Sequence, residues 1–238
     1  MKRYCLYLFI LIGISCSAEL KAQKNGTVYK GNDPAVRYTG RTLVSSDGSV
    51  AFDWVGTYLE TRFTGGKLSV KVSETGTSYY NVFVDGKLHK VVKVCGTDTL
   101  IHLVSGIDKR IHSLKIQKRS EGEFGKTTVH QFVLSGSGRL AEELAVRTRH
   151  IEFIGNSLTC GYGTDGKHRD EPFLVETENC NLTFASMVAR YYDADYTLIA
   201  HSGRGAARNY GDSVRVSKVT MKDRMLNTFD EDLTHKWN

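Results

Sequence analysis

Proline, paired cysteines and long basic runs are scarce in this chain of 238 residues. Two prolines stand against 23 glycines, so glycine must supply most turns, as in β-rich proteins. None of the five cysteines forms a Cys-x-x-Cys pair, which argues against a zinc site. The formal charge is +6, but the basic residues are scattered among acidic ones and form no run. A nucleic-acid partner is therefore not expected. No cofactor motif is present either, and we expect no cofactor.

The N-terminus carries an apolar run that is too short to span a bilayer. A basic start precedes the run over residues 4–15, and small residues lead up to Ala22. This pattern predicts a secretory signal peptide, residues 1–22, and therefore a secreted or periplasmic protein without a membrane span. Lipidation at Cys16 is an alternative, which is weakened because Gly13 stands where a larger aliphatic residue is expected.

A β-sandwich is predicted for the first half of the mature chain. Between residues 36 and 134, short segments such as residues 68–72 alternate apolar and polar side chains, as half-buried strands do. Asp85 and Gly86 separate two such runs and indicate a hairpin. The number of strands favours a jelly roll of two sheets, which we place at residues 30–138.

The periodicity changes after a glycine-rich turn and a short connector, residues 140–146. Residues 151–154 read as a strand, residues 182–192 as a helix, and residues 196–200 as a second strand. A strand, a helix and a strand in this order begin a parallel α/β sheet. We place this part at residues 148–238.

Serine and glycine residues follow both predicted strands of the second part. Ser157 lies on a turn directly after the first strand, and Gly203 lies on a glycine-rich loop after the second. Neighbouring parallel strands would bring the two loops to one edge, where backbone N–H groups can face an oxyanion. Taken alone, a turn like that at Ser157 is more often an ordinary loop than a nucleophile, and the Gly203 loop is also compatible with a flexible connection between a strand and a helix.

Five segments together resemble carbohydrate esterase family 2, which couples an N-terminal jelly roll to an SGNH hydrolase domain. Residues 151–163 (IEFIGNSLTCGYG) look like the first conserved block of SGNH hydrolases. Residues 202–205 (SGRG) and 209–211 (NYG) look like the family's second block. Residues 54–63 and 80–86 are similar to its sandwich domain.

The resemblance implies removal of acetyl groups from plant polysaccharides such as xylan or mannan. The partner would be an acetylated polysaccharide or oligosaccharide. Ser157 matches the nucleophile, and the backbone N–H groups of Ser157 and Gly203 match two oxyanion donors. Asn156 stands where the wider superfamily usually has aspartate, so local hydrogen bonding is expected to differ.

The third family block, Gly-x-Asn-Asp, and the last block with the catalytic histidine have no counterpart here. We therefore expect a partial SGNH domain with an unpaired strand edge, an exposed apolar helix face and an impaired esterase activity. His168, His201 and His235 are the local candidates for a base, but nothing in the sequence brings them to the serine. The alternatives are a non-catalytic carbohydrate-binding protein or fragment, and a structural sandwich at the cell surface.

Three cysteines remain after the predicted signal peptide: Cys95, Cys160 and Cys180. Cys160 and Cys180 flank the loop-rich stretch after Ser157, and export permits oxidation. A Cys160–Cys180 disulfide is therefore predicted, with two unpaired thiols as the alternative.

Overall fold

The computed structural model describes residues 26–141 and 146–237. The predicted signal peptide, residues 1–22, lies outside the described residues. Within them, no helix is both long enough and apolar enough to cross a membrane.

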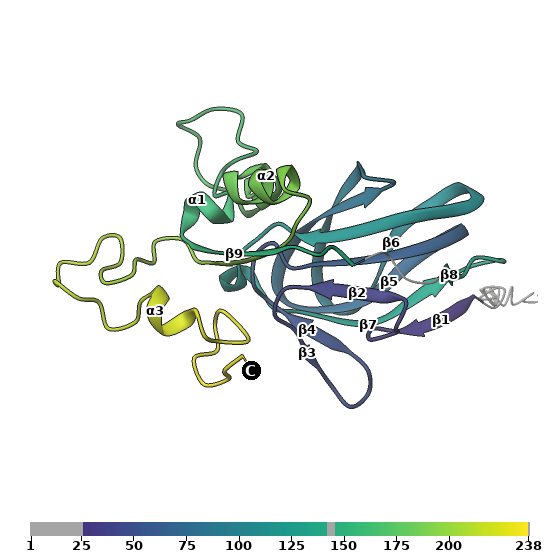
Figure 1. Ribbon diagram of the computed structural model, residues 1–238, viewed down its shortest axis with the longest axis horizontal. Helices are drawn as coiled ribbons and strands as arrows, with labels where there is room; N and C mark the ends of the chain where they lie inside the picture. Colours follow the sequence, from purple (N-terminus) through teal and green to yellow (C-terminus); the bar gives the residue numbers. More distant parts are fainter. Residues whose placement is uncertain (1–25, 142–145, 238) are drawn as a thin grey trace, which may run out of the picture.

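The first part, called the sandwich below, is a curled antiparallel sheet of jelly-roll-like, half-barrel form (Figure 1). The prediction of two separate sheets is wrong, because β1 to β8 are hydrogen-bonded into one sheet that curls on itself. Along the sheet the strands run in the order β2-β5-β7-β4-β3, with β1 on β7 and both β6 and β8 on β5. The strands are β1 (Thr27–Lys30), β2 (Val36–Thr39), β3 (Leu43–Val44), β4 (Val50–Phe52), β5 (Tyr58–Val84), β6 (Lys87–Lys118), β7 (Thr127–Leu134) and β8 (Leu140–Ala141).

Strands β5 and β6 are much longer than the predicted short strands, because each bends at a series of register shifts. Tyr80 on β5 pairs with both Val92 and Lys118 of β6, so the two strands meet twice. Such shifts increase the local twist and let a sheet curl round a core. That core contains fully buried aromatic and aliphatic side chains, including Phe63, Leu68, Val82, Phe132 and Leu134.

The predicted hairpin is confirmed. Val84 pairs with Lys87, and the two residues between them have positive φ angles, 49° for Asp85 and 75° for Gly86. A type I′ turn requires this combination, and Asp-Gly is among its preferred sequences.

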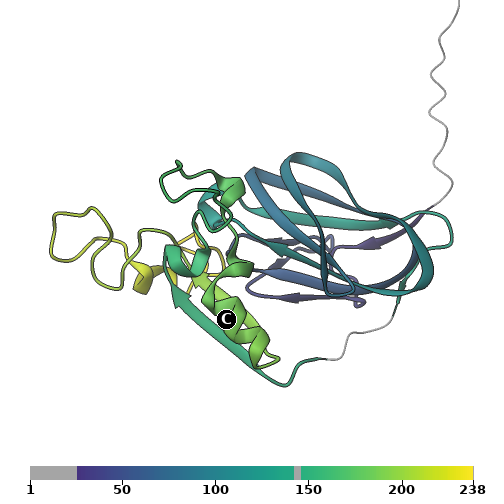
Figure 2. The same ribbon diagram turned by 90° about the horizontal axis from the view of Figure 1, so that it is seen from above.

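The second part is a parallel pair of strands with short helices (Figure 2). The pair is β9 (His150–Gly155) with β10 (Asp195–Ala200). The helical elements are η1 (Gly122–Phe124), α1 (Ser157–Cys160), η2 (Val175–Thr177), η3 (Cys180–Leu182), α2 (Phe184–Tyr191) and α3 (Met221–Arg224), of which η1 belongs to the first part. Among the described residues, β9 pairs with β10 alone, so its other edge is open, as predicted.

The predicted connector, residues 140–146, is partly wrong. Leu140 and Ala141 form β8, because Leu140 pairs with Phe63 at the end of the curled sheet and buries its side chain there. Residues 142–145 lie outside the described part of the chain.

The two parts share buried side chains. Val55 and Tyr58 of the first part pack with Tyr196, Leu198 and other residues of the second. Gly56, with φ 75°, permits this approach, since a Cβ there would lie 2.6 Å from a methyl carbon of Leu198. Trp54 is fully buried against Ile199. The sandwich therefore provides one wall of the parallel pair's core.

The predicted Cys160–Cys180 disulfide is wrong, because both thiols are free. The Cys180 thiol donates to the backbone oxygen of Lys118 at 3.3 Å, whereas the Cys160 sulfur lies among Glu121 and Glu178. The two thiols therefore have separate partners.

Candidate active site

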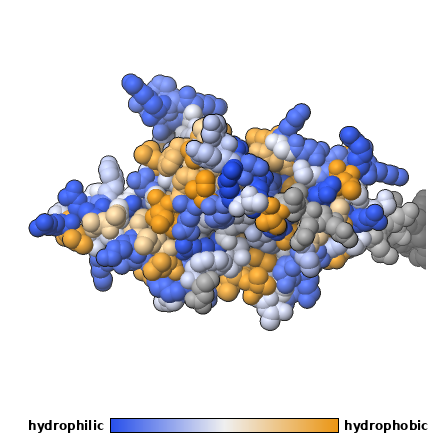
Figure 3. Space-filling model, in the orientation of Figure 1, coloured by the Kyte–Doolittle hydropathy of each residue, from blue (hydrophilic) through white to orange (hydrophobic). Residues whose placement is uncertain are grey.

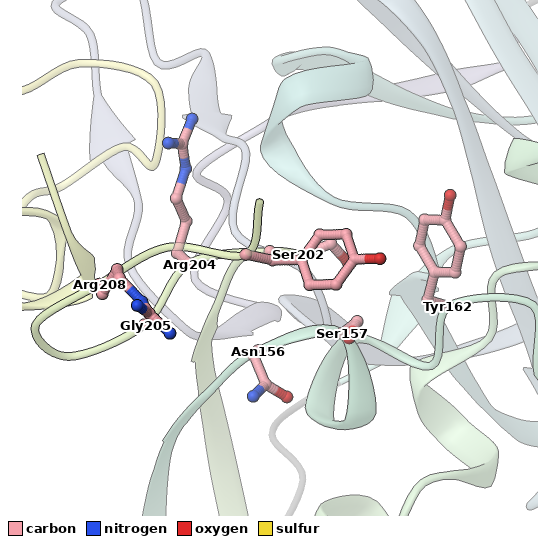
Figure 4. Close-up of a pocket in the computed structure, with 9 residues that line it drawn as sticks. Asn156, Ser157, Tyr162, Ser202, Arg204, Gly205 and Arg208 are labelled. Atoms are coloured by element: carbon pink, nitrogen blue, oxygen red, sulfur yellow. The ribbon is translucent and has the colours of Figure 1, made fainter. Parts of the chain in front are cut away.

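A cavity of about 570 Å³ opens between the loops that follow β9 and β10. Its lining residues come from both loops and from the turn after α1 (Figure 4): Asn156, Ser157, Tyr162, Ser202, Gly203, Arg204, Gly205, Arg208 and Tyr210. Both Ser157 and Ser202 line this cavity, and in the view of Figure 4 Tyr162 lies on one side of them and Arg208 on the other. The structure thus brings Ser157 and Gly203 to one cavity.

Ser157 is the first residue of α1, and its neighbours account for the turn. The Asn156 side chain caps the helix by accepting a hydrogen bond from the Leu158 N–H at 3.1 Å. An asparagine oxygen makes this cap as an aspartate would, so the missing charge leaves the bond intact. Gly161 ends the helix with φ 85°, where a Cβ would collide with the carbonyl of Asn179. Ser157 is therefore held at the strand end by local hydrogen bonds.

Gly203 occupies a left-handed conformation, φ 72°. Hydrogen bonds of Asn209 and Tyr210 fix the other end of its loop. The Tyr210 N–H donates to the Gly203 carbonyl at 2.8 Å. Asn209 accepts from the Gly205 N–H at 3.2 Å and donates to the Val219 carbonyl at 2.8 Å. Within the described residues, the N–H groups of Ser157 and Gly203 have no hydrogen-bond acceptor, which leaves both available to a bound oxygen.

The three candidate histidines are engaged elsewhere. His168 is exposed and accepts from the Asp170 N–H at 3.3 Å. His235 lies 2.8 Å from the Thr228 hydroxyl. His201 is buried, with Nδ1 2.7 Å from Asp230. Across the described residues, no histidine forms a hydrogen bond to the Ser157 hydroxyl, so the structure assigns the base to none of them.

His201 is also in an acidic environment. Burial lowers the pKa of His201, but its hydrogen bond to Asp230 and the surrounding negative charges raise this pKa more. The imidazole is therefore a partner of Asp230 rather than a free base.

Comparisons with known proteins place this architecture in a family. Residues 38–143 match the model described as carbohydrate esterase 2 N-terminal. The cellulase/esterase CelE of Acetivibrio thermocellus is 33% identical over 180 residues, which are 76% of this chain and 22% of that protein. An acetylxylan esterase / glucomannan deacetylase of Cellvibrio japonicus is 31% identical over 201 residues, 81% of this chain and 54% of that protein.

A solved structure agrees with the sequence relatives. A family 2 carbohydrate esterase from Clostridium thermocellum, in complex with cellohexaose, superposes with a TM-score of 0.80 at 31% identity. The match covers 85% of this chain and 61% of that one. The chain belongs to carbohydrate esterase family 2. This family 2 chain spans about half the length of the Cellvibrio relative and about a fifth of the Acetivibrio one.

Sequence reasoning missed a buried acidic cluster beneath the cavity of this family 2 chain. Glu121 follows β6, and its carboxylate accepts hydrogen bonds from both the N–H and the hydroxyl of Ser202. Glu178 lies beside it, and its Oε2 accepts from the Glu121 N–H at 3.0 Å. Burial, and then the negative charge of Glu121, raise the pKa of Glu178 to about 10. Glu178 therefore keeps its proton at neutral pH.

No sequence signal pointed to these residues. Glu121 and Ser202 are 81 positions apart, and Glu121 stands in a polar loop where a solvated carboxylate is the ordinary interpretation. Three groups of His, Cys, Asp and Glu residues around the cluster have ligand atoms within 4.8 Å of one another. Because Ser202 and Arg224 already donate to several of their oxygens, we assign no metal ion to them.

Proposed function

We propose that the protein is a carbohydrate O-acetyl esterase that acts on plant polysaccharides such as xylan or mannan. The observation that carries the proposal is the meeting of Ser157 and Gly203 at one cavity, each with an unpaired backbone N–H. The named relatives support the substrate class, since one is an acetylxylan esterase / glucomannan deacetylase. In the same proposal, residues 30–138 are the sandwich domain, residues 148–238 a partial SGNH domain, and residues 1–22 a signal for export.

The proposed chemistry is acyl transfer through a serine. The Ser157 Oγ attacks the acetyl carbonyl carbon and gives its proton to a base, while the N–H groups of Ser157 and Gly203 hold the oxyanion. Collapse of the intermediate breaks the ester C–O bond, and the sugar oxygen leaves with a proton. Water then hydrolyses the acetyl-serine, which releases acetate and restores the hydroxyl.

Residues 23–238 alone are expected to be a poor esterase. A serine hydroxyl needs an adjacent base, and the three candidate histidines make other contacts. Loss of a single oxyanion donor already costs about 100- to 1,000-fold in turnover. Acetate release at ordinary enzymatic rates by this fragment would contradict the proposed impairment.

The nucleophile is tested in a chain extended by the family's third and last blocks. Ser157→Ala should abolish acetate release from acetylated xylan, while circular dichroism shows an unchanged sandwich. Ser213→Ala is the matched control, because Ser213 is an exposed serine that does not line the cavity. Near-normal turnover by Ser157→Ala would rule out the assignment.

A non-catalytic carbohydrate-binding protein is the second candidate. It is favoured by one observation, the lack of a base at Ser157 among the described residues. Calorimetric binding of an acetylated oligosaccharide without acetate release, in the extended chain as well, would support this candidate over the esterase.

A further inference from the structure

The loop that carries Gly203 is attached to the sandwich by one carboxylate. The Ser202 N–H donates to Glu121 Oε2 at 2.5 Å, and the Ser202 hydroxyl donates to Glu121 Oε1. Glu121 is 0% exposed and lies between β6 and η1, outside the parallel pair of strands. Both oxygens of one buried carboxylate are thus committed to the residue before Gly203.

Glu121 is itself held in place by its neighbours. Its own N–H donates to Glu178 Oε2 at 3.0 Å, and Arg119 fixes the Glu178 backbone by donating to its carbonyl at 2.9 Å. Burial and the nearby charge of Glu121 raise the pKa of Glu178. Both Glu121 oxygens accept hydrogen bonds from Ser202, and hydrogen bonds to a carboxylate are stronger than those between neutral groups.

The Ser202–Gly203 peptide is therefore clamped from both sides. Glu121 holds the N–H and side chain of Ser202, and the Tyr210 N–H holds the Gly203 carbonyl at 2.8 Å. The group left without an acceptor between these two anchors is the Gly203 N–H. An oxyanion donor stabilises charge well only if it is oriented before the reaction, and small displacements of such groups reduce turnover strongly.

We propose that Glu121 of the sandwich is a positioning residue that orients the Gly203 N–H for oxyanion binding. The catalytic role of Glu121 rests on the proposed function. The hydrogen bonds between Glu121 and Ser202 can be tested without measuring turnover. Through this contact the sandwich contributes to the site, because the Glu121 carboxylate sets the conformation of the loop that carries Gly203.

The test is hydrogen–deuterium exchange of residues 23–238, read at the amides of residues 202–205. Glu121→Ala removes both acceptors and should speed exchange there by about tenfold or more, since hydrogen bonds to charged groups are worth at least that factor. Glu121→Gln keeps one acceptor oxygen and should give an intermediate rate. Exchange in the core strand, residues 68–72, should not change in either variant.

Glu176→Gln is the matched control, because the exposed Glu176 carboxylate has a single hydrogen-bond donor among the described residues, the Tyr79 hydroxyl at 3.2 Å. If Glu121→Ala does not fold, the exchange rates at residues 202–205 are compared between Glu121→Gln and Glu176→Gln. Wild-type exchange at residues 202–205 in Glu121→Gln, or in a folded Glu121→Ala, overturns the clamp, whatever the esterase assays show.

In the extended chain, the same variants separate positioning from general instability. Glu121→Ala should lower kcat by about 10- to 100-fold, on the scale of a misplaced catalytic group, with KM within about twofold of the wild-type value. Glu121→Gln should recover part of kcat. A fall in kcat/KM that comes from KM alone would contradict a role in orienting the donor. Loss of turnover in Ser157→Ala tests the nucleophile and is interpreted independently of the Glu121 variants.

Discussion

The proton that Glu178 keeps in the folded protein should make stability depend on pH in a way that one substitution removes. The Glu178 side chain is 0% exposed, and burial next to Glu121 raises its pKa to about 10. In the unfolded chain a glutamate titrates near its ordinary pKa of about 4.3. Between these two values the folded state binds one more proton than the unfolded state.

Rising pH therefore favours unfolding over this window. Linkage gives a loss of at most about 1.4 kcal/mol of unfolding free energy per pH unit for one such proton. From pH 6 to pH 8 the contribution reaches at most about 2.7 kcal/mol. Glu178→Gln cannot titrate, and its side-chain oxygen can still accept from the Glu121 N–H. The variant should thus be more stable than the wild type by an amount that grows with pH.

Urea unfolding at pH 6, 7 and 8 measures this difference, with the fluorescence of the fully buried Trp54 as a probe. Asp53, whose pKa burial raises to about 7, adds a trend of the same sign, but it does so in both proteins and cancels in the difference. Glu176→Gln is the control and should follow the wild type. Parallel curves for wild type and Glu178→Gln across the three pH values would refute the argument.

Three further predictions follow from burial. Trp54→Ala should cost about 3–5 kcal/mol of unfolding free energy, as measured by urea titration, because the indole fills the contact between the two parts; a loss below about 1 kcal/mol would contradict that role. Cys160 and Cys180 should both react with a thiol reagent after denaturation without reductant, and neither should react before it; loss of both thiols from the denatured protein would indicate a bond between them. Tyr191→Ser on the exposed face of α2 should lower binding of a hydrophobic dye without loss of stability; unchanged dye binding would contradict an accessible patch.

The antiparallel strands of the first part could be predicted because their signals are local, whereas their union into one curled sheet could not. A strand buried on one face must alternate apolar and polar side chains, and Asp85-Gly86 supplies the two positive φ angles of a tight hairpin. The lengths of β5 and β6 could not be predicted in this way. Their bends arise at register shifts, and these depend on how distant strands curl round a shared core.

The candidate site was predictable in part for the same reason. Ser157 and Gly203 each follow a recognisable strand, and parallel neighbours place their ends together. The support for the second loop was not predictable, since Glu121 reaches Ser202 across 81 positions and its loop has no periodic pattern. A buried carboxylate is also rare enough that sequence reasoning places it in solvent.

Helix α2 carries the exposed apolar face that was predicted. Its apolar residues at helical spacing predict a helix, and such a stripe usually faces a core. In the structure the stripe of Phe184, Met187, Val188 and Tyr191 is exposed, with Tyr191 at 84%, whereas Ala185 and Ala189 are buried. Figure 3 shows apolar patches over this part of the molecule. The small face packs inward, where Ala185 and Ala189 share a buried cluster with Val55 and Tyr58. The sandwich thus decides which face of α2 is buried, and the large stripe marks the side of the parallel pair that the described residues leave uncovered.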